Sequence, residues 1–247
     1  MAEYSGWFEY DWKFEGDSAV YGVDLDLFDA AREEELPFLF DFSCARPDGE
    51  PLSRGDTARA ERLQRKCAAF LPCYAGCIST DFRLWFFFYG PGPEAMGAVE
   101  ALEMKERKLA CYTGCRREAD WRTYFRLLYP DAAKFQTELN REALAVYEKG
   151  GDVMNTPRRI TLHLFFPAEP LLNQFTEAAR LAGFAVGKSQ FAPEYGLPHG
   201  ISLYRIAPLD KRRIDALTTR AIRLAERFEG KLVHWNCQLI PKKRPLT

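Results

Sequence analysis

The chain has 247 residues, of which 47% are hydrophobic and 28% charged. This balance is typical of a soluble globular protein, and the length suits one large domain or two of ordinary size. The longest apolar run, near 84–89, is far shorter than the ~20 residues of a membrane-spanning helix, and the acidic N-terminus does not resemble a secretory signal. Disordered, collagen-like and helical membrane proteins are thereby excluded. Seven cysteines, an odd number, indicate reduced thiols and a cytoplasmic location.

Charge is distributed unevenly along the chain. Residues 1–154 hold 19 Lys and Arg against 28 Asp and Glu, a net charge of −9. Residues 155–247 hold 15 against 7, a net charge of +8. This asymmetry predicts two halves that dock on each other or that face different partners. A nucleic-acid binder that is basic overall is not indicated, whereas a nucleic-acid surface on the C-terminal half stays open.

The N-terminal half begins with aromatic runs that alternate as strands do. A Gly-Asp turn joins 7–14 to 19–25 and predicts a β-hairpin. The next expected elements are a strand over 37–44, a helix capped by Ser53 or Asp56, strands over 73–80 and 83–89, a helix over 94–108, a strand over 109–117, and helices over 121–128 and 132–148. Residues 37–117 therefore follow the β-α-β-β-α-β order of a ferredoxin-like unit.

The C-terminal half repeats that order after a Gly, Pro and Asn cluster at 149–157, which is the predicted linker. Its expected elements are a strand over 159–166, a helix over 169–182, strands over 184–191 and 201–207, a helix over 210–228 and a strand over 231–240. We predict an α+β fold of two ferredoxin-like units with antiparallel sheets packed with helices. A hairpin and extra helices extend the first unit. The predicted domains are 1–152 and 156–241.

Two Cys-x-x-x-Cys segments, Cys73/Cys77 and Cys111/Cys115, invite a zinc-site interpretation. Residues i and i+4 of a strand lie ~13 Å apart, so one pair cannot chelate a single ion. In the usual ferredoxin-like order the two strands are opposite sheet edges, ~14 Å apart. We therefore expect small buried thiols, with no metal and no cofactor, and the sequence leaves the role of the pairs open.

The three histidines, His163, His199 and His234, do not belong to any of the catalytic motifs considered, and structural or surface roles are expected for them. The strand 83–89 presents Trp85, Phe87 and Tyr89 on one face, an arrangement that some ferredoxin-like domains use to stack RNA bases. Because its other face is also apolar, burial on both sides is the preferred interpretation.

A basic helix supplies the candidate partner-binding residues. They are Lys211, Arg212, Arg213, Arg220, Arg223 and Arg227, joined by Trp235 of the following strand. There are three interpretations, in order of preference: a solvated helix surface, docking to the acidic N-terminal half or to an acidic partner, and contact with RNA phosphates.

Several short motifs carry a family resemblance. The strand 159–166, the run 182–186, the run 224–230 and Val233-His234-Trp235 resemble the family of the regulator of ribonuclease E activity B over about 155–240. The resemblance implies a ferredoxin-like fold and a protein that inhibits an endonuclease by binding it. The founding regulator is acidic, whereas the matching half here is basic.

The N-terminal half resembles domain of unknown function 695. The residues that carry this resemblance are Trp7-x-x-Tyr10, Phe86–Tyr89, Asp120-Trp121-x-x-Tyr124, Leu128-Tyr129-Pro130, and Gly151-Asp152 before Pro157-Arg158. Neither resemblance implies a catalytic residue.

We therefore predict a cytoplasmic, non-enzymatic regulatory protein that binds another protein, with a ribonuclease as one partner and no membrane. The alternatives are an RNA-binding module, an inhibitor of the toxin-immunity type and an enzyme with scattered site residues. The sequence leaves the partner's identity, the oligomeric state and any small ligand open.

Overall fold

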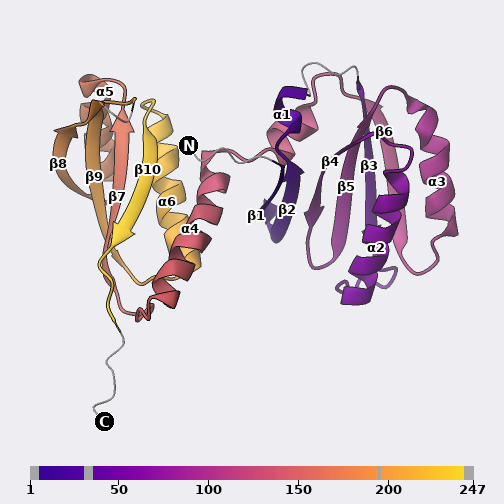
Figure 1. Cartoon of the computed structure of the whole chain (residues 1–247), viewed down its shortest axis with the longest axis horizontal. Coiled ribbons are helices and arrows are strands. Elements are labelled where there is room, and N and C mark those ends of the chain that lie inside the picture. Colours follow the sequence, from indigo (N-terminus) through magenta and orange to yellow (C-terminus); the bar gives the residue numbers. More distant parts are fainter. Residues whose placement is uncertain (1–5, 31–35, 194–195, 242–247) are drawn as a thin grey trace, which may run out of the picture. The chain divides into compact units, whose positions relative to one another are not determined.

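The computed structural model describes residues 6–30, 36–193 and 196–241 (Figure 1). They form a mixed α+β structure that divides into two compact units, Met1–Pro130 and Asp131–Thr247. Each unit is built on one antiparallel sheet packed with helices. The predicted fold class is confirmed.

The N-terminal sheet has six strands in the order β1-β2-β4-β5-β3-β6. They are β1 (Trp7–Phe14), β2 (Asp17–Asp24), β3 (Phe38–Ala45), β4 (Cys73–Ser79), β5 (Arg83–Gly90) and β6 (Ala110–Arg117). Strands β4-β5-β3-β6 form the ferredoxin-like part, and the predicted hairpin β1–β2 extends it because β2 pairs with β4. The expectation that β4 is a sheet edge is therefore wrong.

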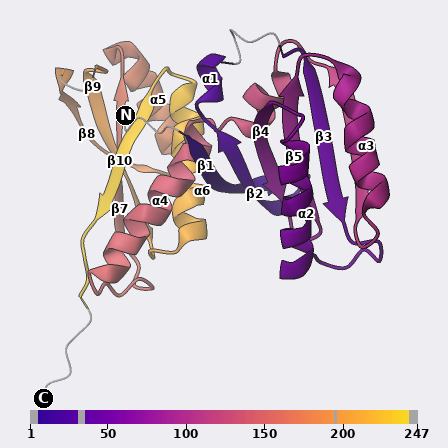
Figure 2. The same ribbon diagram turned by 45° about the vertical axis from the view of Figure 1, so that its right-hand side comes forward.

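Two helices, α2 (Arg54–Cys67) and α3 (Met96–Lys105), cover one face of this sheet (Figure 2). Phe42, Phe86, Leu63 of α2 and Val99 of α3 belong to one buried cluster. Ser53 is the N-cap of α2, where its hydroxyl accepts from the backbone N–H of Asp56. The N-terminal unit also contains a short α1 (Leu27–Ala30) and a 3-10 turn, η1 (Pro93–Ala95).

Strand β5 is buried on both faces over residues 86–89. Phe86 and Phe88 point into the helix-covered core, while Phe87 and Tyr89 on the other face are 5% and 0% exposed. The Tyr89 ring stacks on Trp121, with 3.9 Å between centroids, just before the π-helix η2 (Tyr124–Leu128). The predicted burial on both sides is confirmed for this part of the strand.

The C-terminal unit has a four-stranded sheet in the order β10-β7-β9-β8, the ferredoxin-like arrangement. Its strands are β7 (Arg158–Phe166), β8 (Ala185–Phe191), β9 (His199–Ala207) and β10 (Lys231–Cys237), and its crossover helices are α5 (Glu169–Leu181) and α6 (Lys211–Glu226). Every second residue of β7 from Ile160 to Phe166 lies in one core with Phe175 of α5 and Ile214 of α6.

An additional helix, α4 (Ala132–Lys149), belongs to the C-terminal unit. Leu144 of α4 is part of the same core as the crossover helices. The units therefore divide at Pro130/Asp131, whereas the sequence predicted 152/156. The difference arises because α4 packs beside α6, a long-range contact that no local composition shift reports.

The segment predicted to be a linker, residues 149–157, is a turn within this unit that hydrogen bonds hold in place. The Arg158 guanidinium donates to the Asp152 carboxylate at 2.6 Å and to the backbone carbonyls of Val153 and Gln238 at 2.5 and 3.1 Å. The same Asp152 oxygen accepts from the backbone N–H of Ile240 at 2.8 Å. Burial alone would raise the Asp152 pKa, but the bonds from Arg158 and Ile240 outweigh it and hold the pKa below its usual value.

Candidate functional site: the basic face of helix α6

Helix α6 forms because its sequence separates one apolar stripe from a basic face. Asp210 caps it by accepting from the backbone N–H of Arg213 at 3.0 Å. Its buried residues recur at helical spacing and face the sheet and α4: Ile214, Thr218, Ala221, Ile222 and Ala225. The arginines occupy the exposed face, as the sequence predicts.

The structure divides the six predicted basic residues into two groups. The Lys211 ammonium is paired with Asp215 at 2.7 Å, and Arg223 is paired with Asp131 at 2.6 Å and Glu226 at 3.2 Å. The other four are exposed and, among the residues that the structure describes, have no carboxylate partner: Arg212, Arg213, Arg220 and Arg227. Of the six predicted residues, these four have guanidinium groups whose charge is available to a ligand.

Three of those arginines form what we call the arginine row: Arg213 and Arg220 of α6, and Arg227, which is the C-cap of the helix. Positions seven apart on a helix lie ~10.5 Å apart along its axis and drift by only ~20° around it. The Arg220 guanidinium lies 5.8 Å from the ring centroid of Phe184, and Arg205 of β9 lies 5.9 Å from the same ring. A row of this kind suits carboxylates, with which each planar guanidinium forms two parallel hydrogen bonds.

Trp235 does not lie on this surface. Its side chain is 8% exposed, its indole N–H donates to Asn140 Oδ1 at 2.7 Å, and its ring stacks on Tyr147 at 6.0 Å. The prediction that Trp235 contacts a partner is therefore replaced by a structural role. Large aromatic surface near a basic helix indicated binding in the sequence, whereas α4 covers this ring in the fold.

Asn140 of α4 is a buried residue that sequence reasoning missed. Its amide oxygen accepts from Trp235 and from Gln136 Nε2 at 2.9 Å, and its amide nitrogen donates to Asp215 Oδ1 at 2.8 Å and Thr218 Oγ1 at 2.9 Å. All four hydrogen-bonding positions of the amide are therefore satisfied. The contact fixes α4 against α6 and β10, and it holds Asp215 where it pairs with Lys211.

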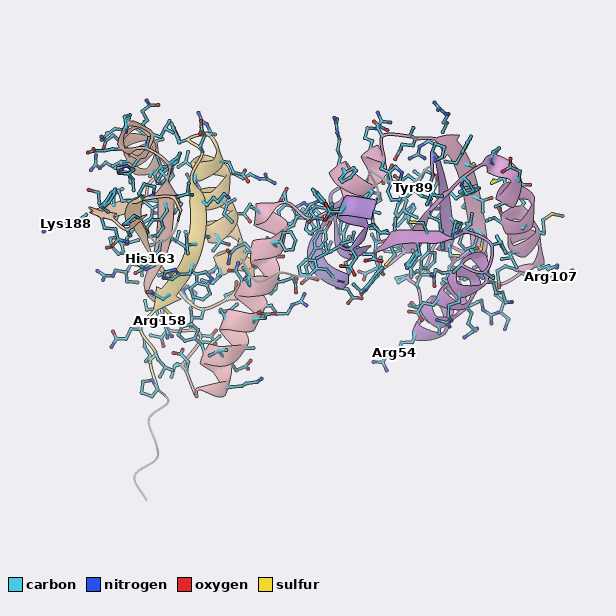
Figure 3. The ribbon with its side chains drawn as sticks, turned by 45° about the horizontal axis from the view of Figure 1, so that its top comes forward. Arg54, Tyr89, Arg107, Arg158, His163 and Lys188 are labelled. Atoms are coloured by element: carbon cyan, nitrogen blue, oxygen red, sulfur yellow. The ribbon has the colours of Figure 1, made fainter. Side chains whose placement is uncertain are left out.

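The histidines separate into a pair and a single residue. His163 of β7 and His234 of β10 stack with ring centroids 4.3 Å apart, while His199 contacts Phe191 at 5.5 Å. Burial lowers the pKa of both stacked imidazoles, and for His163 the neighbouring His234 lowers the pKa further. Figure 3 labels His163 on the C-terminal sheet.

The cysteine pairs lie on β4 and β6, which two strands separate, so the structure does not bring them together. Instead, the Sγ atoms of Cys44 and Cys111 lie 3.4 Å apart across β3 and β6. None of the seven cysteines forms a disulfide. Within the described parts of the chain, no group of three or more His, Cys, Asp or Glu side chains is arranged to hold a metal ion.

A buried carboxylate in the N-terminal unit was also missed. Glu118 accepts from Tyr89 Oη and the Thr123 backbone N–H, both at 2.7 Å, and from Arg116 at 3.3 Å. Burial alone would raise the Glu118 pKa, but these bonds outweigh it and lower the pKa. With Trp121 stacked on Tyr89, the carboxylate fastens the segment before η2 to the sheet.

Comparison with known protein families gives a match to the C-terminal unit. Residues 137–237 match the family described as regulator of ribonuclease activity B, a span from within α4 to the end of β10. No curated protein matches the chain. A similar solved structure is that of an unknown protein from Galdieria sulphuraria, with 11% sequence identity and a TM-score of 0.22. The aligned region covers 82% of this chain and 97% of the other. None of the helices described is long and apolar enough to cross a membrane.

Proposed function

We propose that this protein is a non-catalytic regulator that binds another protein, and that the partner is a ribonuclease. The observation that carries the proposal is the family match over residues 137–237, which includes all four strands and both crossover helices of the C-terminal unit. A protein that acts by binding needs no catalytic residue, so the proposal is compatible with a site made of arginines. We also propose that it acts in the cytoplasm.

The contact surface that we propose is the arginine row with Arg212. Unpaired guanidinium groups on a fixed helix need no internal ion pair to be broken before a partner binds. The complementary surface would present carboxylates, because charged groups across an interface are arranged with opposite sign. The proposed partner surface is therefore acidic.

The test is an inhibition assay with endoribonucleases purified from the same organism. Cleavage of a labelled single-stranded RNA is followed with the RNA in large molar excess over the chain, so that RNA binding by the chain cannot deplete the substrate. We expect one of these enzymes to be slowed by the wild-type chain. Absence of inhibition across the organism's endoribonucleases would contradict the proposal.

A charge-reversal pair identifies the surface. Arg213→Glu with Arg220→Glu should raise the half-inhibitory concentration about 10-fold or more, because each reversal puts like charges across the interface. The matched control, Arg122→Glu with Arg126→Glu, makes the same change at exposed sites of the N-terminal unit. It should stay within about two-fold of the wild type. Equal losses in both variants would reject the arginine row as the contact surface.

A further inference from the structure

The C-terminal sheet has one face that the helices of its unit do not cover. Ile160, Leu162, Ile201 and Leu203 point into the core beneath α5 and α6. Because successive side chains of a strand point to opposite faces, the residues between them lie on the other face. That open face carries Arg159, Thr161 and His163 of β7, Ser202 and Tyr204 of β9, and His234 and Asn236 of β10.

The strands of this sheet do not contain a single Asp or Glu. They hold all three histidines of the chain together with five arginines and lysines: Arg158, Arg159, Lys188, Arg205 and Lys231. Arg158 is buried in its ion pair with Asp152. Figure 3 labels Lys188 on β8 and His163 on β7. An anion meets no carboxylate on this sheet, whereas the N-terminal sheet carries acidic residues such as Glu9, Asp11 and Asp41.

Tyr204 lies across the open face over a glycine. A Cβ atom at Gly187 of the neighbouring strand would meet the Tyr204 hydroxyl at 2.6 Å, so only glycine leaves room for this ring position. The Arg159 guanidinium lies 4.6 Å from the ring centroid. The guanidinium lies over the ring, so the pair combines a flat aromatic surface with a cation stacked on it. Aromatic rings on which bases stack, next to positive charge that follows the phosphates, are what proteins use to bind single-stranded nucleic acid.

The stacked histidines supply polar groups beside that ring. Asn236 Nδ2 lies 3.1 Å from His163 Nε2 and is only a donor, so Nε2 accepts. The ring hydrogen then resides on Nδ1, which donates to Ser202 Oγ at 3.2 Å. The Ser202 hydroxyl hydrogen remains for another acceptor. Hydroxyl and amide groups at this level of the sheet are suited to the 2′-hydroxyl, which distinguishes RNA from DNA.

We infer that the open face of the C-terminal sheet binds single-stranded RNA, with a base stacked on Tyr204, a phosphate at Arg159 and the ribose near Ser202 and Asn236. A duplex is disfavoured because its base faces are already stacked. The arginine row belongs to α6 and is a separate surface. RNA binding needs no ribonuclease, so this inference and the proposed function are tested independently.

The experiment is fluorescence anisotropy of a labelled 12-nucleotide oligouridine titrated with the full chain at several salt concentrations. We expect saturable binding that weakens with salt. Tyr204→Ala should weaken binding about 10-fold, while Tyr204→Phe, which keeps the ring, should stay within about two-fold of the wild type. Arg159→Ala should reduce the slope of the log–log salt plot by about 1.

Two further variants keep the test decisive. Thr161→Glu, directly opposite Tyr204 in the β7–β9 register, adds a negative charge without removing the ring and should also weaken binding. Arg122→Ala with Arg126→Ala, at exposed sites of the N-terminal unit, should leave binding within about two-fold of the wild type. Thermal unfolding of each variant verifies that it is folded.

The inference is overturned by any of four results. They are no binding by the wild type, unchanged binding by folded Tyr204→Ala and Thr161→Glu, loss of binding in the Arg122→Ala/Arg126→Ala variant instead, or equal affinity for oligothymidine or an RNA duplex.

Discussion

At the residue scale, the C-terminal unit depends on a buried amide. Asn140 joins α4 to Thr218 of α6 and Trp235 of β10 through hydrogen bonds of 2.7 to 2.9 Å. Sequence patterns predicted that a helix passes through Asn140 but not that its amide is a buried anchor. An isolated polar residue on a helix has the same local signature whether water or another helix covers it.

Asn140→Ala should lower the free energy of unfolding by about 2–4 kcal/mol, because the Trp235 N–H and the Thr218 hydroxyl lose a buried partner. Asn173→Ala, an exposed asparagine of α5, serves as the matched control and should change it by less than about 0.5 kcal/mol. Urea denaturation of both variants provides the measurement. Equal effects would show that Asn140 is not an anchor.

The stacked histidines make stability depend on pH. Burial lowers the pKa of His163 and His234 below the unfolded value, so the unfolded chain binds more protons between the folded and unfolded pKa values. The two neutral histidines should make their full contribution to the free energy of unfolding above about pH 6.5. That contribution should fall as the pH drops below this value. The ring neighbours Ser202 and Asn236 are uncharged, and the strands offer no carboxylate to offset the effect.

Urea midpoints measured between pH 7 and pH 5.5 test this dependence. His163→Asn with His234→Asn should flatten the profile, whereas His199→Asn, outside the stacked pair, should keep the wild-type slope. A wild-type midpoint that rises on acidification would contradict the assignment.

At the scale of elements, local patterns were sufficient for the C-terminal strands and helices. The alternation in β7 and the apolar stripe of α6 fixed their bounds to within two residues of the structure. They were insufficient for α4, whose length and periodicity were predicted but whose packing was assigned to the wrong half. Trp235 was misplaced for the same reason, since α4 is what buries it.

Removal of α4 tests its assignment. A fragment of residues 131–247 should unfold cooperatively, whereas 155–247 should lose cooperative unfolding because Leu144, Tyr147 and Asn140 no longer cover Trp235. Differential scanning calorimetry distinguishes the two fragments. Equal transition temperatures would show that the helix is an appendage and that the sequence-based boundary was better.

At the scale of the whole molecule, the two units differ in charge. The first holds 16 Lys and Arg against 23 Asp and Glu, and the second 18 against 12. The sequence predicted this asymmetry and the duplicated ferredoxin-like order, because charge and periodicity are local properties. The Cys44–Cys111 contact and the open sheet face depend on strand order and were not found. The resemblance of the N-terminal half stays a prediction.

We propose that the chain binds a ribonuclease directly through the arginine row of α6. Sedimentation velocity of the inhibited endoribonuclease mixed with the chain, with RNA absent, detects such a complex. We predict a complex that forms with the wild type and with Arg122→Glu/Arg126→Glu, and that is lost with Arg213→Glu/Arg220→Glu. Two species that sediment independently, or a complex that appears only when RNA is added, would contradict the claim.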